Sequence, residues 1–300
     1  MAGRTLMESQ LETGAPDHAG ILRCPHCHGS LQRLGRTLRC VHGHSFDIAR
    51  RGYVNLLPSA HRHSKDPGDN REMILARRRF LDGGFFDPIA DAVTGAVAAA
   101  LVNADGEAKR SVLDAGAGEG YYLARLRPSL SSPTTALYGV DISRHAVQFA
   151  THRSKEATWL VASIVDLPVT SASVDVILSV FSPLAPVEFQ RVLRPTGTLI
   201  IVAPGPRHLY SLRQHLYPEV FLHESEQFLA TLATAFAPVS ESLLRYEIEL
   251  PTRQHVSDLL TMTPFGWNVD QARREAAEAG APLRTAVEVI IRHLRPLPAP

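Results

Sequence analysis

From residue 112 to residue 203, short runs of β-branched and apolar residues alternate with stretches of helical periodicity. The runs that predict strands cover residues 112–113, 136–140, 158–162, 174–180 and 198–203. Helical patterns at residues 145–153 and 186–193 lie between them. This alternation predicts an α/β fold in which a mostly parallel sheet is covered by helices on both faces.

Flanking this region, the pattern predicts further helices and two late strands. Apolar residues recur at helical spacing from residue 73 to residue 80, and Asp69 followed by Glu72 resembles a capping box at the start of that helix. A second helix is expected from about residue 88 to residue 102. The late strands are expected at 243–250 and 285–294, with a helix at 253–262 between them.

The chain divides into four segments. Residues 1–20 are polar and without periodicity, which predicts a disordered tail. Residues 21–57 hold all three cysteines and form a candidate metal-binding module, and residues 58–84 form a linker and the capped helix. Residues 85–300 form the α/β domain.

Composition limits the class of protein. The 300 residues are 45% hydrophobic and 20% charged, which suits a globular chain with a sizeable core. The longest nearly apolar stretch, residues 92–102, is too short to span a bilayer, and the start of the chain lacks a secretory signal pattern. We therefore expect a cytoplasmic protein without a membrane partner.

Charge is distributed unevenly along the chain. Residues 21–65 carry eight basic groups against Asp47 alone, a net charge of +7 in a chain whose total is +1. A compact basic end favours a polyanionic partner such as RNA. The alternative is the solvated surface of an arginine-rich protein, and charge alone leaves both open.

The cysteines have the spacing of a metal site. Cys24 and Cys27 form a C-x2-C pair, and Cys40 and His44 follow after a twelve-residue gap as C-x3-H. Three thiolates and an imidazole satisfy a tetrahedral zinc ion and leave no open position, so the expected role is structural. Two alternatives are reduced cysteines without metal and a redox C-x2-C pair; the latter lacks the usual strand-to-helix setting.

A glycine-rich turn follows the first strand of the α/β domain. Asp114, Gly116, Gly118 and Gly120 give D-x-G-x-G-x-G, in which glycines permit a tight turn and close approach of a ligand. Asp141 ends the next strand, where its carboxylate can accept both ribose hydroxyls. The pair of acids indicates an S-adenosylmethionine (SAM) site, with a capped structural turn as the alternative.

Two further segments suit the same site. Ser163 follows the third strand and is expected at the adenine edge. Phe181 follows the fourth, where substrate and methyl donor meet, and either stacks on an aromatic substrate or belongs to the core. The N/D-P-P-Y/F pattern of adenine and cytosine amino methylation is absent there.

Several short motifs occur in a characteristic order, at residues 46–47, 52–58, 66–69, 118–122, 204–209 and 262–265. Together with the zinc knuckle they resemble the RlmA family of 23S rRNA guanine-N1 methyltransferases. The resemblance implies a class I SAM-dependent methyltransferase domain, with a Rossmann-like mostly parallel sheet, behind a small zinc-binding RNA-recognition module. It also places Phe86, Glu119, Gly120, Tyr121 and His208 around the cofactor.

The resemblance further implies the partner and the reaction. The partner would be the hairpin 35 region of 23S rRNA, and the enzyme would be a homodimer. The long N-terminus favours the guanine-748 subgroup, linked to resistance against tylosin-type macrolides, over the guanine-745 subgroup. Candidate phosphate contacts are Arg50, Arg51, Arg62, Lys65 and Arg71.

Two other functions remain open at this point. A SAM-dependent small-molecule methyltransferase of natural-product biosynthesis would explain the α/β domain but not the basic zinc module. An RNA-binding protein with a vestigial cofactor fold is disfavoured by the intact Asp114 and Asp141. The residue that accepts the guanine N1 proton is not assigned, since His208 suits either a base or a cofactor contact.

Overall fold

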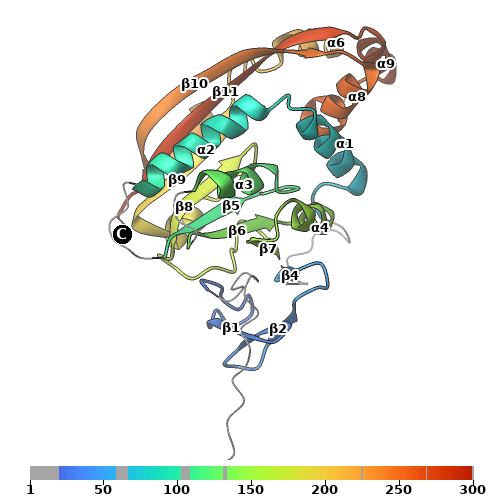
Figure 1. Cartoon of the computed structure of the whole chain (residues 1–300). Coiled ribbons are helices and arrows are strands. Elements are labelled where there is room, and N and C mark those ends of the chain that lie inside the picture. Colours follow the sequence, from blue (N-terminus) through green and yellow to red (C-terminus); the bar gives the residue numbers. More distant parts are fainter. Residues whose placement is uncertain are drawn as a thin grey trace, which may run out of the picture.

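A computed structural model of the chain describes residues 20–58, 67–102, 109–130, 134–223, 226–267 and 269–298, with backbone alone for 226–229. A broad twisted sheet carries helices against it, with a small N-terminal module at one end (Figure 1). The tail predicted for residues 1–20, apart from Gly20, lies outside the described residues, as do Arg62 and Lys65.

The main sheet of the described chain has eight strands in the order β10-β11-β9-β8-β5-β6-β7-β4. They are β4 (Tyr53–Asn55), β5 (Ser111–Ala115), β6 (Ala136–Asp141), β7 (Ala157–Val161), β8 (Val174–Val180), β9 (Leu193–Pro204), β10 (Phe236–Leu250) and β11 (Leu283–Pro296). Neighbours from β4 to β9 are parallel, whereas β9, β11 and β10 pair antiparallel. Every residue of β5, β7 and β8 is buried, as in a sheet covered on both faces. The predicted α/β architecture is confirmed.

Helices cover both faces of this sheet. They are α1 (Arg71–Asp82), α2 (Asp87–Val102), α3 (Tyr121–Leu126), α4 (Arg144–Arg153), α5 (Pro186–Val192), α6 (Tyr210–Leu216), α7 (Glu226–Ala233), α8 (Arg253–Met262) and α9 (Gln271–Ala279). Successive strand residues alternate between two cores: Val112 packs with α2, α3 and α4, and Leu113 packs with α5 on the other face. The period-2 alternation of a strand thus builds both cores at once.

The N-terminal module rests on the second face. Its own sheet contains β1 (Leu31–Leu34), β2 (Thr37–Cys40) and β3 (Ser45–Asp47) in antiparallel order. Leu22, Leu31 and Leu38 are fully or almost fully buried in the same core as Phe189 of α5. The module and the large sheet therefore share a continuous apolar core.

Strand β4 joins the two parts covalently and by hydrogen bonding. It lies on the module's side of the boundary predicted at residue 57, yet it is the edge strand of the large sheet. Tyr53 pairs with Trp159 of β7, and Tyr53 Oη accepts from Arg144 and Gln148 of α4. The period-2 pattern of three residues was too short to reveal this strand, which depends on a partner far along the chain.

Most predicted elements agree with the structure to within a few residues, and β8 and α8 agree at both ends. The capping prediction is wrong. Asn70 caps α1, its Oδ1 accepting from Met73 N at 3.0 Å, whereas Asp69 forms an ion pair with Arg77 at 2.5 Å. Asp69 and Asn70 are both good capping residues, and Asn70 takes the cap because Asp69 pairs with Arg77.

Within the described residues, no single helix has the length and apolar composition to cross a membrane. Helices α1 and α2 have sufficient length and apolar composition only when they are counted together across the 85° bend between them.

Candidate zinc centre and cofactor site

The four predicted zinc ligands come together in the module. The Sγ atoms of Cys24, Cys27 and Cys40 and a ring nitrogen of His44 lie within 4.8 Å of one another. Cys27 Sγ is 3.6 Å from Cys40 Sγ, and His44 Nδ1 is 3.5 and 3.4 Å from the sulfurs of Cys24 and Cys40. A tetrahedral zinc ion requires about 3.8 Å between sulfurs and about 3.6 Å between sulfur and nitrogen. The donor set therefore fits a structural zinc ion.

Two tight turns present these ligands. In the first, Cys24 N donates to Gly29 O and His28 N donates to Cys24 O, with His28 at a left-handed φ of 57°. In the second, Gly43 N donates to Cys40 O and Cys40 N to His44 O, with Gly43 at φ 87°. The turns select His44 over the other nearby histidines, because only its ring closes on the three sulfurs among the described residues.

The predicted cofactor turn lies where the order of the parallel strands reverses. From β5 the chain continues outward through β6 and β7, whereas β8 and β9 lie on the opposite side of β5. Ligands of such sheets bind in the crevice beyond the carboxyl ends of the strands at this point. The turn after β5 meets the end of β8 there: a Cβ on Gly116 would lie 1.9 Å from Ser182 Oγ.

Buried oxygens without hydrogen-bond partners surround this edge in the described structure. They are Asp114 Oδ2, Ser179 Oγ and Ser182 Oγ. Burial, together with the nearby Asp141 carboxylate, raises the pKa of Asp114 to about 8. An uncompensated buried acid is costly, and a cationic ligand group would restore its ionised form. The unpartnered acceptors thus fit the ammonium of a methionine moiety.

The three glycines of the turn all have positive φ but differ in surroundings. Gly120, at φ 84°, lies under Trp159 and Ala150, where an added Cβ would come to 2.7 and 3.0 Å. Gly118, at φ 56°, has only Arg77 Nη1 near that position, at 3.5 Å. Gly120 therefore serves helix-to-strand packing, whereas Gly118 leaves room for a ligand.

Asp141, a predicted cofactor residue, lies beside this turn, and Ser163 follows the next strand but one. Asp141 ends β6 and accepts at 2.8 Å from both Gly118 N and Ser143 N, which holds its carboxylate against the turn. Each carboxylate oxygen keeps a further lone pair for a ribose hydroxyl. Ser163 follows β7, and its Oγ accepts from Val165 N at 3.4 Å.

Glu119 and Tyr121 are held by protein groups instead. Both Glu119 carboxylate oxygens accept from Arg153, at 2.6 and 2.8 Å, and the side chain is 1% exposed. Tyr121 Oη donates to Asp87 Oδ1 at 2.5 Å. Their side chains fix α3 to α4 and α2, so any contact with a cofactor falls to the Glu119 backbone and the Tyr121 ring.

Phe86 and His208, far apart in the chain, belong to one aromatic cluster with Phe181 and Phe265. The His208 ring is 6.5 Å from Phe86, 5.7 Å from Phe181 and 6.4 Å from Phe265. Burial lowers the pKa of His208 to about 4, so the ring is neutral. Its Nδ1 lies 2.8 Å from the Glu288 carbonyl oxygen and 3.3 Å from Glu288 N, so the tautomer of the ring decides whether this nitrogen donates or accepts.

The described RNA-contact candidates are all exposed. Arg50 and Arg51 occupy the turn before β4, and Arg71 is the first residue of α1. Arg51 Nη1 donates to Gln148 Oε1 at 3.4 Å, which is a surface contact. The neighbouring run of arginines in α1 forms ion pairs: Arg77, Arg78 and Arg79 each contact an aspartate, and Arg79 stays half exposed.

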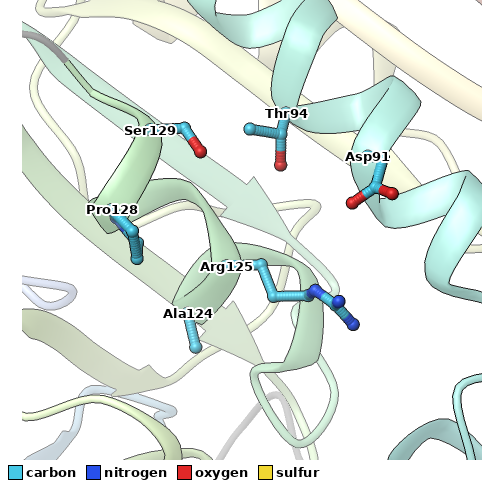
Figure 2. A pocket seen from close by; sticks show the side chains of 6 residues that line it. All are labelled: Asp91, Thr94, Ala124, Arg125, Pro128 and Ser129. Carbon is cyan, nitrogen blue, oxygen red and sulfur yellow. The ribbon is translucent and has the colours of Figure 1, made fainter.

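An open pocket of about 490 Å³ lies elsewhere, between α2 and α3. Asp91 and Thr94 project from α2 opposite Arg125, with Ser129 on the turn that follows α3 (Figure 2). None of the predicted cofactor residues lines it. It is therefore distinct from the cofactor edge.

Sequence reasoning missed the groups that the fold brings to this edge from a distance. Arg77 of α1 approaches Gly118 in the turn, and no spacing connects the two; the segment 179–183 at the end of β8 was predicted at this site, and its Ser182 lies against Gly116. Phe181 has a left-handed φ of 51°, a strained conformation at the end of β8 that no sequence pattern announces.

Comparison with known proteins also divides the chain into a zinc module and a methyltransferase domain. The RlmA N-terminal zinc-ribbon family matches residues 22–65, and a methyltransferase-domain family matches residues 107–247. The chain is 35% identical to the 23S rRNA (guanine(748)-N(1))-methyltransferase of Streptomyces fradiae over 281 residues, 92% of this chain and 97% of that protein. It is 36% identical over 302 residues to a candidate 23S rRNA (guanine-N1)-methyltransferase of Micromonospora griseorubida, covering 94% of this chain and 99% of the relative. A similar candidate from Bacillus subtilis is 34% identical over 263 residues, with coverage of 84% and 89%.

Proposed function

The chain belongs to the family of 23S rRNA (guanine-N1)-methyltransferases, and from that premise we propose that it methylates N1 of a guanine in 23S rRNA. Its fold is the class I SAM-dependent methyltransferase fold with an N-terminal zinc ribbon. One observation carries the proposal. The glycine turn with the unpartnered Asp114 meets Phe181 and Ser182 at the strand-order reversal, where a methyl donor and an aromatic acceptor can be juxtaposed.

The chain's own residues have distinct roles in this proposal. S-adenosylmethionine, when bound, supplies an electrophilic methyl group on a positively charged sulfur. Asp114 accepts from its ammonium group, Asp141 from its ribose, and Ser163 borders the adenine. Gly116, Gly118 and Gly120 allow the backbone to approach, with Phe86, Tyr121 and His208 enclosing the methionine end. The resulting alignment of donor and acceptor is worth up to about 7–11 kcal/mol of the barrier in favourable cases.

The acceptor atom sets a requirement on the RNA. Guanine N1 lies on the Watson–Crick edge and carries a proton, so the base must be unpaired or extruded before it reacts. Single-stranded loops meet this condition and allow stacking on aromatic side chains such as Phe181. The basic zinc module, through Arg50 and Arg51, would hold the surrounding phosphates. A small-molecule methyltransferase needs no such module.

The proposal extends to the target site, the assembly and the location. We propose that the target lies in the hairpin 35 region and is of the guanine-748 type, since the Streptomyces fradiae relative carries that name. The modification would contribute to resistance against tylosin-type macrolides. The enzyme would act as a homodimer in the cytoplasm, where ribosomes are found.

Tritium transfer from labelled SAM to a hairpin 33–35 transcript tests the proposal. Because N1 methylation blocks base pairing, reverse transcriptase should stop one nucleotide before the modified base. A stop at the guanine-748 position supports the full assignment, and a stop at another guanine corrects the subgroup. No transfer by folded, zinc-loaded protein that binds SAM would overturn the rRNA assignment.

A further inference from the structure

A second group of unpartnered polar atoms lies beside the aromatic cluster, away from the glycine turn. In the described structure, Arg213 Nη1 and His223 Nε2 are buried and make no hydrogen bond. Arg213 is 8% exposed, and none of the described ion pairs includes it. A buried guanidinium with free N–H groups is unfavourable unless an acceptor reaches it. We therefore look to a bound ligand for the acceptor of the Arg213 Nη1 hydrogen bond.

The Arg213 side chain is held in place by two contacts. Its Nη2 donates to Phe221 O at 2.5 Å, and its Cζ lies 5.4 Å from the centre of the Phe265 ring. The first contact ties α6 to the segment after it, and the second stacks the guanidinium on an aromatic face. These contacts leave Nη1 as the group without an assigned partner.

This guanidinium adjoins the reacting end of the sheet. Phe265 is 6.4 Å from His208, which is 5.7 Å from Phe181 at the end of β8. Burial is the largest cause of the low pKa of His208; the charges of His223 and Arg213 lower it further, whereas the hydrogen bond with the Glu288 backbone raises it. Phe181, 39% exposed, is the accessible face of this aromatic cluster. The cluster thus offers stacking surfaces beside an unsatisfied cationic donor.

Guanine matches that combination. Its O6 and N7 are acceptors, and arginine is the side chain that most often donates to them. Unpaired bases stack on aromatic rings in RNA recognition. O6 also adjoins the N1 atom, so a donor at O6 is placed where negative charge develops when N1 loses its proton.

We propose that Phe181 and Phe265 of the aromatic cluster receive the target base and that Arg213 Nη1 donates to guanine O6, selecting guanine and stabilising the N1 anion. The inference rests on the proposed function. In the step it assists, N1 bonds to the methyl carbon as the carbon–sulfur bond breaks and its electron pair returns to sulfur. The N1 proton passes to water. Arg213 stays protonated throughout and transfers nothing.

An atom-exchange experiment on the hairpin transcript tests this assignment. Single-turnover rates are measured for guanine, 6-thioguanine and 7-deazaguanine at the target, with wild-type protein and with Arg213→Gln. Sulfur is a poor acceptor, so the wild type should prefer guanine to 6-thioguanine, and Arg213→Gln should reduce that preference about 10-fold or more. The ratio of guanine to 7-deazaguanine should be the same in both proteins. Because each ratio compares two substrates of one protein, a general structural defect cancels.

Controls separate the possible failures. Arg273→Gln, an exposed arginine of α9, should leave both ratios unchanged. Arg213→Lys, which keeps a cation, serves if Arg213→Gln loses its fold, and it should retain part of the preference. An unchanged 6-thioguanine ratio in a folded Arg213 variant overturns the assignment, and a changed 7-deazaguanine ratio moves the contact to N7. Failure of the wild type to methylate the guanine transcript instead refutes the proposed function.

Discussion

The zinc centre and the cofactor edge are both built from short sequence motifs, yet they differ in how completely their polar atoms are paired. At the zinc centre, four donor atoms close within 4.8 Å and leave no free position for a ligand. At the cofactor edge, Asp114, Ser179 and Ser182 each keep a buried oxygen without a partner. A structural site is closed by its own residues, whereas a binding site leaves polar groups for the ligand to satisfy.

Removal of the metal should produce the largest effect and test whether the zinc centre is structural. Cys40→Ser is expected to lower the free energy of unfolding by about 5 kcal/mol or more, since structural zinc supplies about 10–16 kcal/mol in isolated zinc-finger peptides. Denaturant unfolding with zinc analysis measures this. His42→Ala, beside the ligands but outside them, should keep its zinc and its stability. A zinc-free Cys40→Ser protein as stable as the wild type would contradict the structural role.

Alanine substitutions at two glycines of the cofactor turn should differ in their effect on the free energy of unfolding and on SAM binding. Gly120→Ala combines a φ of 84° with a contact of 2.7 Å to Trp159, and should destabilise the protein by about 2–4 kcal/mol. Gly118→Ala has open space and a milder φ, so we expect a loss of about 1 kcal/mol. Unfolding curves and SAM titrations of both variants measure the difference. Equal destabilisation by the two substitutions would remove the distinction.

Substitution of Asp114 should show that this buried acid binds the cofactor and lowers the free energy of unfolding of the ligand-free protein. Asp114→Asn is expected to weaken SAM binding about 10- to 100-fold, because it removes a charged acceptor. In ligand-free protein the folded pKa of about 8 exceeds the unfolded value of about 3.9. The stability linked to this group is therefore fully present below about pH 4 and is lost as the pH rises through about 8.

The corresponding measurement is denaturation of ligand-free protein at pH 5, 7 and 9. Asp114→Asn should lose less stability than the wild type between pH 5 and pH 9. Asp91→Asn, an exposed acid of α2, should follow the wild type. Parallel curves for Asp114→Asn and wild type would refute the unpaired-acid interpretation.

The smallest effect concerns the surface of the zinc module. Replacing Arg50 and Arg51 with alanine should leave stability unchanged and lower RNA affinity several-fold. The slope of log affinity against log salt should fall by about 1 to 2, because each phosphate contact releases roughly 0.7–0.9 counterion. Arg284→Ala, an exposed arginine of β11, is the control. An unchanged slope would exclude these arginines from the RNA contact.

Sequence was most informative where the participating residues lie close together in the chain. The zinc ligands span 21 residues and the glycine turn seven, so spacing alone identified both. It failed where side-chain geometry decides between two suitable neighbours. Asp69 and Asn70 both suit the cap of α1, and spacing does not show that Asp69 pairs with Arg77 instead.

The proposed substrate side of the site could not be predicted, because its residues come from distant parts of the chain. Packing of α6 and α8 brings together Arg213, His223 and Phe265. In the sequence, none of the three belongs to a motif that indicates a binding site. Phe86 and His208 were reached through family resemblance, not through spacing. Much of the cofactor site could therefore be predicted from one short segment, whereas the residues proposed to recognise the base are distributed over the fold.

The pairing of β4 with β7 also bears on how the protein is made. The zinc ligands emerge from the ribosome early and close together, so the module can bind metal while most of the chain is still to be synthesised. Trp159, the partner of Tyr53, follows it by more than 100 residues. The zinc module therefore cannot pair β4 with the large sheet until β7 has been synthesised.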